Sequence, residues 1–309
     1  MSNKEAKPAT VLKEFFSKPE HFADVINAVF FDGNEVIYPE MLLEADTDVS
    51  STIRVKDKTI SLERFRDVVK KTTYGCDWVI VGIENQLKVH YGMPLRTMTY
   101  DVLNYLKQCE EAKDKHKKGK NKSSAEEFLS GLQKGEKLHP VFTLVIYYGE
   151  DAWDGPFSLR DMLDVPEGWE MLLPDYGMNL LEVRESGRYH FRNQAVDEVF
   201  EISRTIFEKN YAILKEKYGK KEISAEAAMA VGAITGSKRL LRYVTESEKG
   251  EMNMCRALEE LEQEAMEQGL EQAKCIIVKN MLRKGLDMKD IAELTEVPLE
   301  MVEKVKAEL

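Results

Sequence analysis

Hydrophobic side chains follow two different periods along the first 150 residues, one typical of helices and one of strands. After Pro19, apolar residues recur every three or four positions over residues 22–29. This spacing predicts an amphipathic helix with Asp24 on its polar side. The residues Asp32-Gly33-Asn34 should end that helix. A second helix is expected over residues 95–109, where apolar residues again recur at helical spacing.

Three apolar runs predict strands, at residues 65–69, 78–86 and 141–148. Residues 74–77 have the composition of a turn, so the first two runs should form a hairpin. The run over 78–86 is apolar on both faces until its end, which is typical of a central strand covered on both sides. Helices and strands in this order predict a small α/β core.

The chain becomes almost entirely helical after residue 190. Long helices are expected over 226–243 and 252–284, followed by two short helices around residues 295–298. We therefore predict two regions, residues 15–190 with the α/β core and residues 191–309 with the helices. At 309 residues the chain is long enough for about two domains.

The helical region contains two patterns that indicate association. Met254, Leu258, Leu261 and Ala265 are spaced by four, three and four residues, a short heptad-like seam. A homodimer through the C-terminal helices fits this seam, and so does a helical hairpin within one chain. Residues 287–306 have a helix-turn-helix pattern, but its second helix carries Glu300 and Glu303, which oppose contact with phosphates. We interpret the tail as a packing or dimerisation module.

Composition narrows the protein class. No apolar run reaches the roughly 20 residues of a membrane helix, and the N-terminus has no apolar signal core. We therefore expect a cytoplasmic protein without a membrane partner. The four cysteines and five histidines are scattered along the sequence, so neither a zinc site nor a disulfide framework is predicted.

The charge distribution leaves room for a local nucleic-acid contact. The net charge is −11, but residues 246–271 contribute −7 of it, so the rest carries only −4. A basic run, expected as a surface loop, contains Lys113, Lys115, Lys117 and Lys118. Such lysines neutralise backbone phosphates without reading sequence, although a solvated surface has the same composition.

The end of the second strand carries the strongest candidate chemistry. Glu84 and Gln86 lie two residues apart and therefore point to the same face. Asp67 stands across the expected hairpin, so a suitable register makes the two carboxylates neighbours. Adjacent carboxylates repel unless a cation lies between them, and oxygen ligands suit Mg²⁺ (or Mn²⁺). The alternative is that Glu84 is simply solvated at a strand end.

Asp67 followed by Glu84-Asn85-Gln86 resembles the Asp…Glu-x-Lys core of the PD-(D/E)XK nuclease superfamily, in a variant that ends in Gln. Nearly the whole chain resembles the Rpn (recombination-promoting nuclease) family. The similar segments include His21-Phe22-Ala23-Asp24, Glu44-Ala45-Asp46-Thr47, Arg66-Asp67-Val68, Gly82-Ile83-Glu84-Asn85-Gln86, Tyr91-Gly92-Met93-Pro94-Leu95-Arg96, Tyr100-Asp101 and Trp153-Asp154-Gly155-Pro156.

The resemblance implies a restriction-endonuclease-like core and a divalent-metal DNA endonuclease linked to recombination or mobile elements. It implies that Asp67 and Glu84 are metal ligands and that Gln86 takes the place of the usual lysine. Asp24 is then a candidate outer ligand or water-holding carboxylate, with a surface salt bridge as the alternative role. Asp46 is a weaker candidate of the same kind.

The glutamine departs from the family pattern, because a neutral amide stabilises a charged phosphate less than an ammonium does. A catalytically silent nuclease-like scaffold that binds DNA or protein is therefore a second hypothesis, and an RNA-cleaving nuclease is a third. Arg96 lies on the helix after the strand. It is expected either to meet a phosphate or to form a structural bridge to Glu84.

Overall fold

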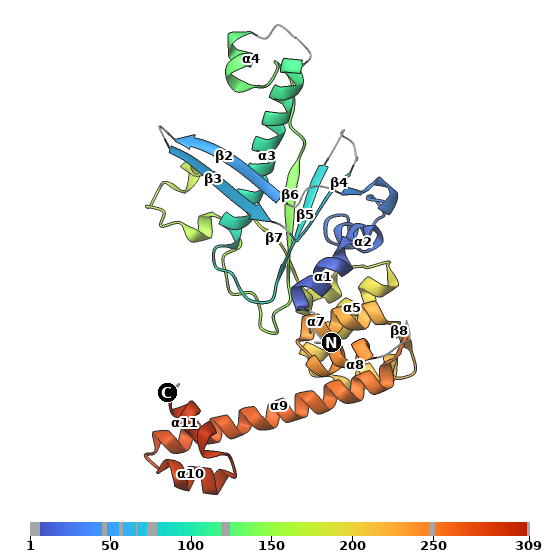
Figure 1. Cartoon of the computed structure of the whole chain (residues 1–309), viewed down its shortest axis with the longest axis vertical. Coiled ribbons are helices and arrows are strands. Elements are labelled where there is room, and N and C mark those ends of the chain that lie inside the picture. Colours follow the sequence, from blue (N-terminus) through green and yellow to red (C-terminus); the bar gives the residue numbers. More distant parts are fainter. Residues whose placement is uncertain are drawn as a thin grey trace.

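The protein has the α/β architecture predicted from its sequence, with a mixed sheet, helices on both of its faces and a long helix leading to a small C-terminal module (Figure 1). The computed structural model describes residues 7–44, 48–55, 58–65, 67–72, 79–118, 124–246 and 251–307. Asp46, Lys120, Lys122 and the expected turn at 74–77 lie outside these described residues.

The sheet has the order β1-β4-β5-β6-β7. Its strands are β1 (Leu43–Glu44), β4 (Val68–Thr72), β5 (Val79–Gln86), β6 (Val141–Tyr147) and β7 (Asn179–Glu182). β1, β4 and β5 pair antiparallel, whereas β5, β6 and β7 pair parallel. The predicted hairpin of β4 and β5 and the predicted strand β6 are confirmed.

One strand boundary was wrong. The first hairpin strand begins at Val68, because Phe65 ends a separate hairpin of β2 (Asp48–Val55) and β3 (Lys58–Phe65), in which it pairs with Asp48. The sequence analysis missed that hairpin. Both strands mix charged and hydroxyl residues with few apolar ones, so neither shows the apolar run that marks a buried strand.

Helices cover both faces of the sheet. α1 (Pro8–Ser17) and α2 (Pro19–Phe30) pack with one face in a core that includes Val68, Ile83 and Leu144. α3 (Met93–Lys118) lies on the opposite face, where Val69 packs near Tyr105 and Val145 packs near Met93. The alternation of side chains in β5 therefore directs Ile83 toward α1 and Glu84 toward α3.

The predicted helices in this half are confirmed, with corrected lengths. α2 ends before Asp32 and Gly33, which both have positive φ. α3 runs to Lys118 rather than to residue 109, so Lys113, Lys115, Lys117 and Lys118 lie on a helix and not on a loop. Basic residues in the last turn suit the negative end of the helix dipole, which favours the longer helix.

Short elements complete the N-terminal half. α4 (Ala125–Ser130) begins at a capping box formed by Ser124 and Glu127. The 3₁₀ turns are η1 (Pro39–Met41), η2 (Arg160–Met162), η3 (Glu170–Leu172) and η4 (Val183–Arg188). The segment between β6 and β7 thus contains the two short turns η2 and η3.

The C-terminal half is mainly helical, as predicted. It contains α5 (Gln194–Phe207), α6 (Tyr211–Tyr218), α7 (Ala225–Thr235), α8 (Lys238–Glu246) and α9 (Met254–Arg283), with a small pair of strands, β8 (Glu222–Ser224) and β9 (Glu251–Asn253). The single helix expected over 226–243 is wrong, because Gly236 at φ 70° ends α7 in the left-handed conformation. α5 and α7 share one buried core with α1 and α2, across residue 190.

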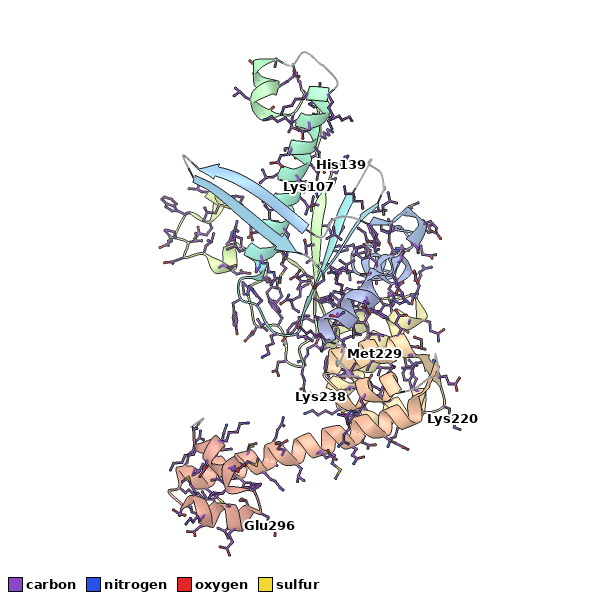
Figure 2. All side chains as sticks on the ribbon, viewed as in Figure 1. Lys107, His139, Lys220, Met229, Lys238 and Glu296 are labelled. Carbon is purple, nitrogen blue, oxygen red and sulfur yellow. The ribbon has the colours of Figure 1, made fainter. Side chains whose placement is uncertain are left out.

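The end of α9 forms the C-terminal module together with α10 (Met288–Thr295) and α11 (Leu299–Ala307). Its own core contains Val278, Ile291 and Val302, while Glu300 and Glu303 are exposed. Figure 2 shows Glu296 in this module, at the opposite end of α9 from Lys238 and Met229. The side chains of the heptad-like seam at 254–265 fall outside the described part.

The remaining predictions concern membrane-spanning helices and the cysteines. Within the described ranges, every helix is too short or too polar to cross a membrane. Cys109 and Cys275 are free thiols.

Truncating Leu144 in the central strand tests the shared core. Leu144 is fully buried, so Leu144→Ala should lower the free energy of unfolding by about 2–5 kcal/mol. Leu129→Ala, at a leucine that is 84% exposed, should change it by less than about 0.5 kcal/mol. Urea unfolding followed by circular dichroism measures both, and equal effects would contradict the described packing.

Candidate functional site

The end of β5 places three polar side chains beside a buried sheet. Glu84 is only 2% exposed and faces α3, and Gln86 lies on the same face. Gln86 Nε2 donates to Glu84 Oε1 at 3.2 Å. Asn85 points to the other face, where the hydroxyl of Tyr148 donates to its Oδ1. The two faces of this strand end thus have separate polar networks.

The hairpin register brings Asp67 to Glu84. Val68 pairs with Ile83, so the next position along the hairpin sets Asp67 against Glu84. The backbone N–H of Asn85 donates to Asp67 Oδ2 at 2.7 Å, which holds the aspartate at the strand end. This register is the feature that the sequence analysis left open. The structure therefore sets the two residues opposite each other on adjacent chain segments, and both carboxylates act on Arg96.

Arg96 supplies positive charge at this edge. Its guanidinium lies 2.5 Å from Glu84 Oε1 and donates through Nε to the Tyr100 hydroxyl at 2.8 Å. Burial by itself would lower the pKa of Arg96, but Glu84, Tyr100 and Asp67 together raise it. Of the two roles expected for Arg96, the bridge to Glu84 is therefore present in this structure.

The charge of Asp67 also reaches the other face of the sheet. Burial raises the pKa of Tyr148 well above its usual value, and the nearby Asp67 carboxylate raises it further. Tyr148 thus stays a neutral hydrogen-bond donor to Asn85. Tyr148 was not predicted as a site residue, because an aromatic residue at the end of a buried strand has the same pattern as any core residue.

The donor set of the site matches a hard divalent cation in part. Asp67 and Glu84 supply two carboxylates, and Mg²⁺ commonly takes one or two from the protein, with water and a substrate phosphate completing its shell. Within the described residues there is no group of three or more His, Cys, Asp or Glu side chains that could hold an ion. The residues therefore fit an ion shared with a phosphate, and not a closed protein cage.

Asp24 lies on the other side of the sheet from Glu84. It is on α2, which packs against the Ile83 face, and its Oδ1 accepts a 2.9 Å hydrogen bond from the Arg192 backbone N–H. Burial raises the pKa of Asp24, although the backbone N–H groups of Arg192 and Asn193 oppose the shift. The structure thus ties Asp24 to the start of α5 and does not bring it to Asp67.

The lysines of the basic run are exposed, but they lie far along α3 from Arg96. Lys113, Lys115, Lys117 and Lys118 lie near the far end of α3. At the rise of an α-helix, Lys113 is about 26 Å along the axis from Arg96. Lys117 lies 3.6 Å from Asp114, an exposed pair of little energetic weight.

Asp101 is a buried carboxylate that the sequence analysis named but assigned no role. It is 4% exposed, and it accepts a 2.9 Å hydrogen bond from Thr143 of β6 and another from the Tyr176 hydroxyl. These bonds hold α3 on the sheet one turn beyond Arg96. An aspartate on the apolar side of a predicted helix is the signal that points to it.

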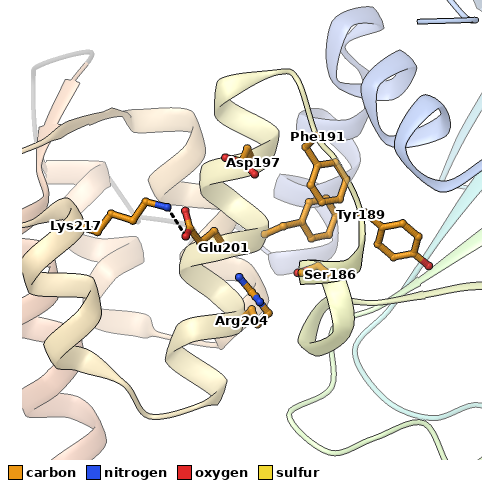
Figure 3. Close-up of a pocket in the computed structure, with 9 residues that line it drawn as sticks. Ser186, Tyr189, Phe191, Asp197, Glu201, Arg204 and Lys217 are labelled. Carbon is orange, nitrogen blue, oxygen red and sulfur yellow. Dashed lines mark hydrogen bonds and ion pairs between the residues drawn. The ribbon is translucent and has the colours of Figure 1, made fainter. Parts of the chain in front are cut away.

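A polar hollow of about 150 Å³, separate from the strand-end site, lies between α5 and α6 (Figure 3). Lys217 forms an ion pair with Glu201, and the Tyr218 hydroxyl donates to the same carboxylate. Burial would raise the pKa of Glu201, but these two partners hold it below its usual value. The hollow is thus crossed by bonds that attach α6 to α5.

Substitution of Asp24 separates a structural role from a chemical one. A raised pKa in the folded state means that the charged form is penalised at neutral pH, so stability should rise as the pH falls toward the unfolded value of about 3.9. Asp24→Asn removes that charge and keeps an acceptor for the Arg192 N–H. At neutral pH the variant should therefore unfold at an equal or higher urea concentration than the native chain. Its stability should no longer rise as the pH falls.

Asp24→Ala provides the contrast. It leaves the Arg192 N–H without its acceptor, and it should cost about 1–3 kcal/mol. If Asp24→Asn were instead as destabilising as Asp24→Ala, the buried charge itself would be required for folding.

No family model, no curated protein and no solved structure matches this chain. The resemblance to the Rpn family therefore stays a prediction from the sequence, and the geometry of the site carries the functional argument.

Proposed function

We propose that the protein is a divalent-metal-dependent DNA endonuclease that hydrolyses phosphodiester bonds. One observation carries the proposal. The β4–β5 register and the hydrogen bond from Asn85 to Asp67 bring Asp67 and Glu84 together at one end of a central strand. Two carboxylates in this position favour a cation between them and a phosphate beside it.

The order of elements supports the same reading. Helices precede an antiparallel pair of strands, a helix follows, and the next strand returns parallel to the second. We propose that this is the PD-(D/E)XK type of core, with a specific member of it, the Rpn family, suggested by the sequence. A link to recombination or mobile elements belongs to that same proposal.

Each residue at the edge has a proposed task. Asp67 and Glu84 would hold Mg²⁺ or Mn²⁺, and such an ion polarises a phosphodiester and activates a water. Gln86 would orient the water or a phosphate oxygen through its amide. Arg96 has a side chain that is 33% exposed, so its guanidinium can turn from Glu84 to a phosphate that arrives at the edge. Lys113, Lys115, Lys117 and Lys118 would contact DNA only if it extended along α3.

A silent scaffold is the alternative, and Arg96 is the observation that favours it. Its guanidinium already neutralises Glu84, which removes the need for a metal ion. Gln86 in place of lysine points the same way. In that case the protein would bind DNA or another protein without cleaving it, and a homodimer through the C-terminal helices would be part of its assembly.

Nicking of supercoiled plasmid with Mg²⁺ tests the proposal. The native chain should nick the plasmid, EDTA should abolish the activity, and Glu84→Gln and Asp67→Asn should each lower the rate by at least about 100-fold. The matched control is Glu198→Gln, the same change at another buried glutamate, 4% exposed on α5, which should retain the native rate. Equal nicking by all variants would place the activity elsewhere. No nicking by any, with DNA still bound, would favour the scaffold.

A second test removes Arg96, whose guanidinium pairs with the Glu84 carboxylate that the ion would bind. Arg96→Met leaves Glu84 buried without its cation, which should destabilise the fold by about 3–5 kcal/mol in EDTA. Mg²⁺ should then raise the melting temperature more in this variant than in the native chain, because the ion replaces the guanidinium. Arg192→Met, which breaks the 3.2 Å pair with Glu35, is the control and should gain no such response. An equal response in native chain and Arg96→Met would reject Asp67 and Glu84 as the ion site.

A further inference from the structure

A hollow of about 630 Å³ lies at the sheet edge that carries Glu84 and Gln86. Its lining includes Tyr91, Asp154, Phe157, Asp161 and Met162. Tyr91 belongs to the connection from β5 to α3, and the others follow β6 along the chain. Because β5 and β6 are parallel neighbours, both connections leave the same edge of the sheet. The hollow is therefore at the same edge of the sheet as the candidate site and shares none of the site residues.

Two aromatic rings stand exposed at this hollow. Tyr91 is 62% exposed and Phe157 is 52% exposed. Exposed rings at a concave surface are the elements on which unpaired nucleobases stack, because every base presents a flat apolar face. Neither ring is needed for the core, since their buried neighbours Trp153 and Tyr147 pack on each other at 5.2 Å between ring centres.

The backbone around the hollow is held in place. Asp161 accepts hydrogen bonds from the N–H groups of Phe157 at 2.9 Å and Ser158 at 2.8 Å. At Gly155, an added Cβ would meet the Trp153 ring and Val89 at 3.0 Å, so the loop packs tightly on these two side chains. Phe157 is thus presented by a loop whose backbone is held by its own hydrogen bonds.

The charges at the hollow disfavour a phosphate and favour a hydrogen-bond donor. Its polar groups are the carboxylates of Asp154 and Asp161 and the Tyr91 hydroxyl, and no lysine or arginine is among the described residues that line it. The Tyr91 hydroxyl lies 3.2 Å and 3.3 Å from the two Asp154 oxygens, which leaves that carboxylate able to accept further bonds. Carboxylates accept from the exocyclic amino group of cytosine.

We propose that this hollow binds an unpaired nucleobase with an exocyclic amino group, stacked on Tyr91 and Phe157 and hydrogen-bonded to Asp154. A strand placed so would pass the Asp67–Glu84 edge, with exposed Lys88 of the same connection near its backbone. That the ligand is a nucleic acid rests on the proposed function, whereas the base preference follows from the hollow. The substrate of the site would then contain single-stranded or distorted DNA.

Binding to short fluorescent homopolymers of deoxycytidine and of thymidine tests this, with the full chain in EDTA so that no cleavage occurs. At C4 cytosine carries an amino donor where thymine carries a carbonyl acceptor, and thymine also has an N3–H and a C5 methyl group, so a deoxyuridine strand serves as the control for the methyl group. Fluorescence anisotropy should show at least about fivefold tighter binding of the deoxycytidine strand. Asp154→Ala, which removes the acceptor, should bind both strands with equal affinity.

The rings are tested in the same assay. Tyr91→Ala and Phe157→Ala should each weaken binding of both strands by about 5- to 100-fold. Tyr38→Ala is the matched control, because Tyr38 is a 43% exposed aromatic residue outside the hollow, and it should bind like the native chain. All three rings are exposed, so their truncation leaves the fold intact, which circular dichroism checks.

Two results would overturn the inference. One is equal binding of both strands by the native chain, whatever the effect of Tyr91→Ala. The other is binding of oligolysine, and not of either strand, through Tyr91, which would make the hollow a site for basic peptides. Plasmid nicking is measured separately. A base preference without nicking would reject the nuclease and keep the base site. Nicking without a base preference would keep the nuclease and reject the base site.

Discussion

The buried carboxylate of Glu84 is the constraint around which the end of the sheet is organised. A carboxylate that is 2% exposed is costly unless a cation or hydrogen-bond donors satisfy it, and here Arg96 and Gln86 both contact its Oε1. Asp67 lies beside it through the hairpin register and the Asn85 N–H. The charge of Glu84 is thus balanced by Arg96, and any ligand that displaces this guanidinium must replace its charge.

The rest of the fold keeps this edge rigid. β5 is hydrogen-bonded on both sides and covered by α1 and α2 on one face and α3 on the other. Asp101 attaches α3 to β6 about one turn from Arg96, and this hydrogen bond holds the helix that carries the arginine against the sheet. The same core continues through α5 and α7, which links the position of the edge to helices more than 100 residues away in sequence.

Charge is divided among separate surfaces of the molecule. The paired carboxylates and Arg96 occupy the strand ends, the exposed lysines lie at the far end of α3, and the aromatic hollow carries only acidic groups in its described lining. Acidic α9 leads away to the C-terminal module. A polyanion would therefore meet favourable charge along α3 and at Arg96, while the hollow suits an uncharged base.

Much of this could be predicted from the order of residues. Periodicity identified α2, β5, β6, α9 and the two short C-terminal helices, because apolar spacing reports directly which face of an element is buried. The same alternation placed Glu84 and Gln86 on one face. The β2–β3 hairpin and the break at Gly236 were missed, because polar strands carry no apolar run and one glycine is tolerated within many helices.

Relations between distant segments could not be predicted in this way. The one-residue register that sets Asp67 against Glu84, the contact of Arg96 with Glu84, and the position of Asp24 behind the sheet all depend on how elements pack. Local propensity decides which residues form a strand or helix, since those energies act within a few residues. Which side chains meet is decided by the burial of apolar faces over the whole chain, and that is a property of the folded arrangement.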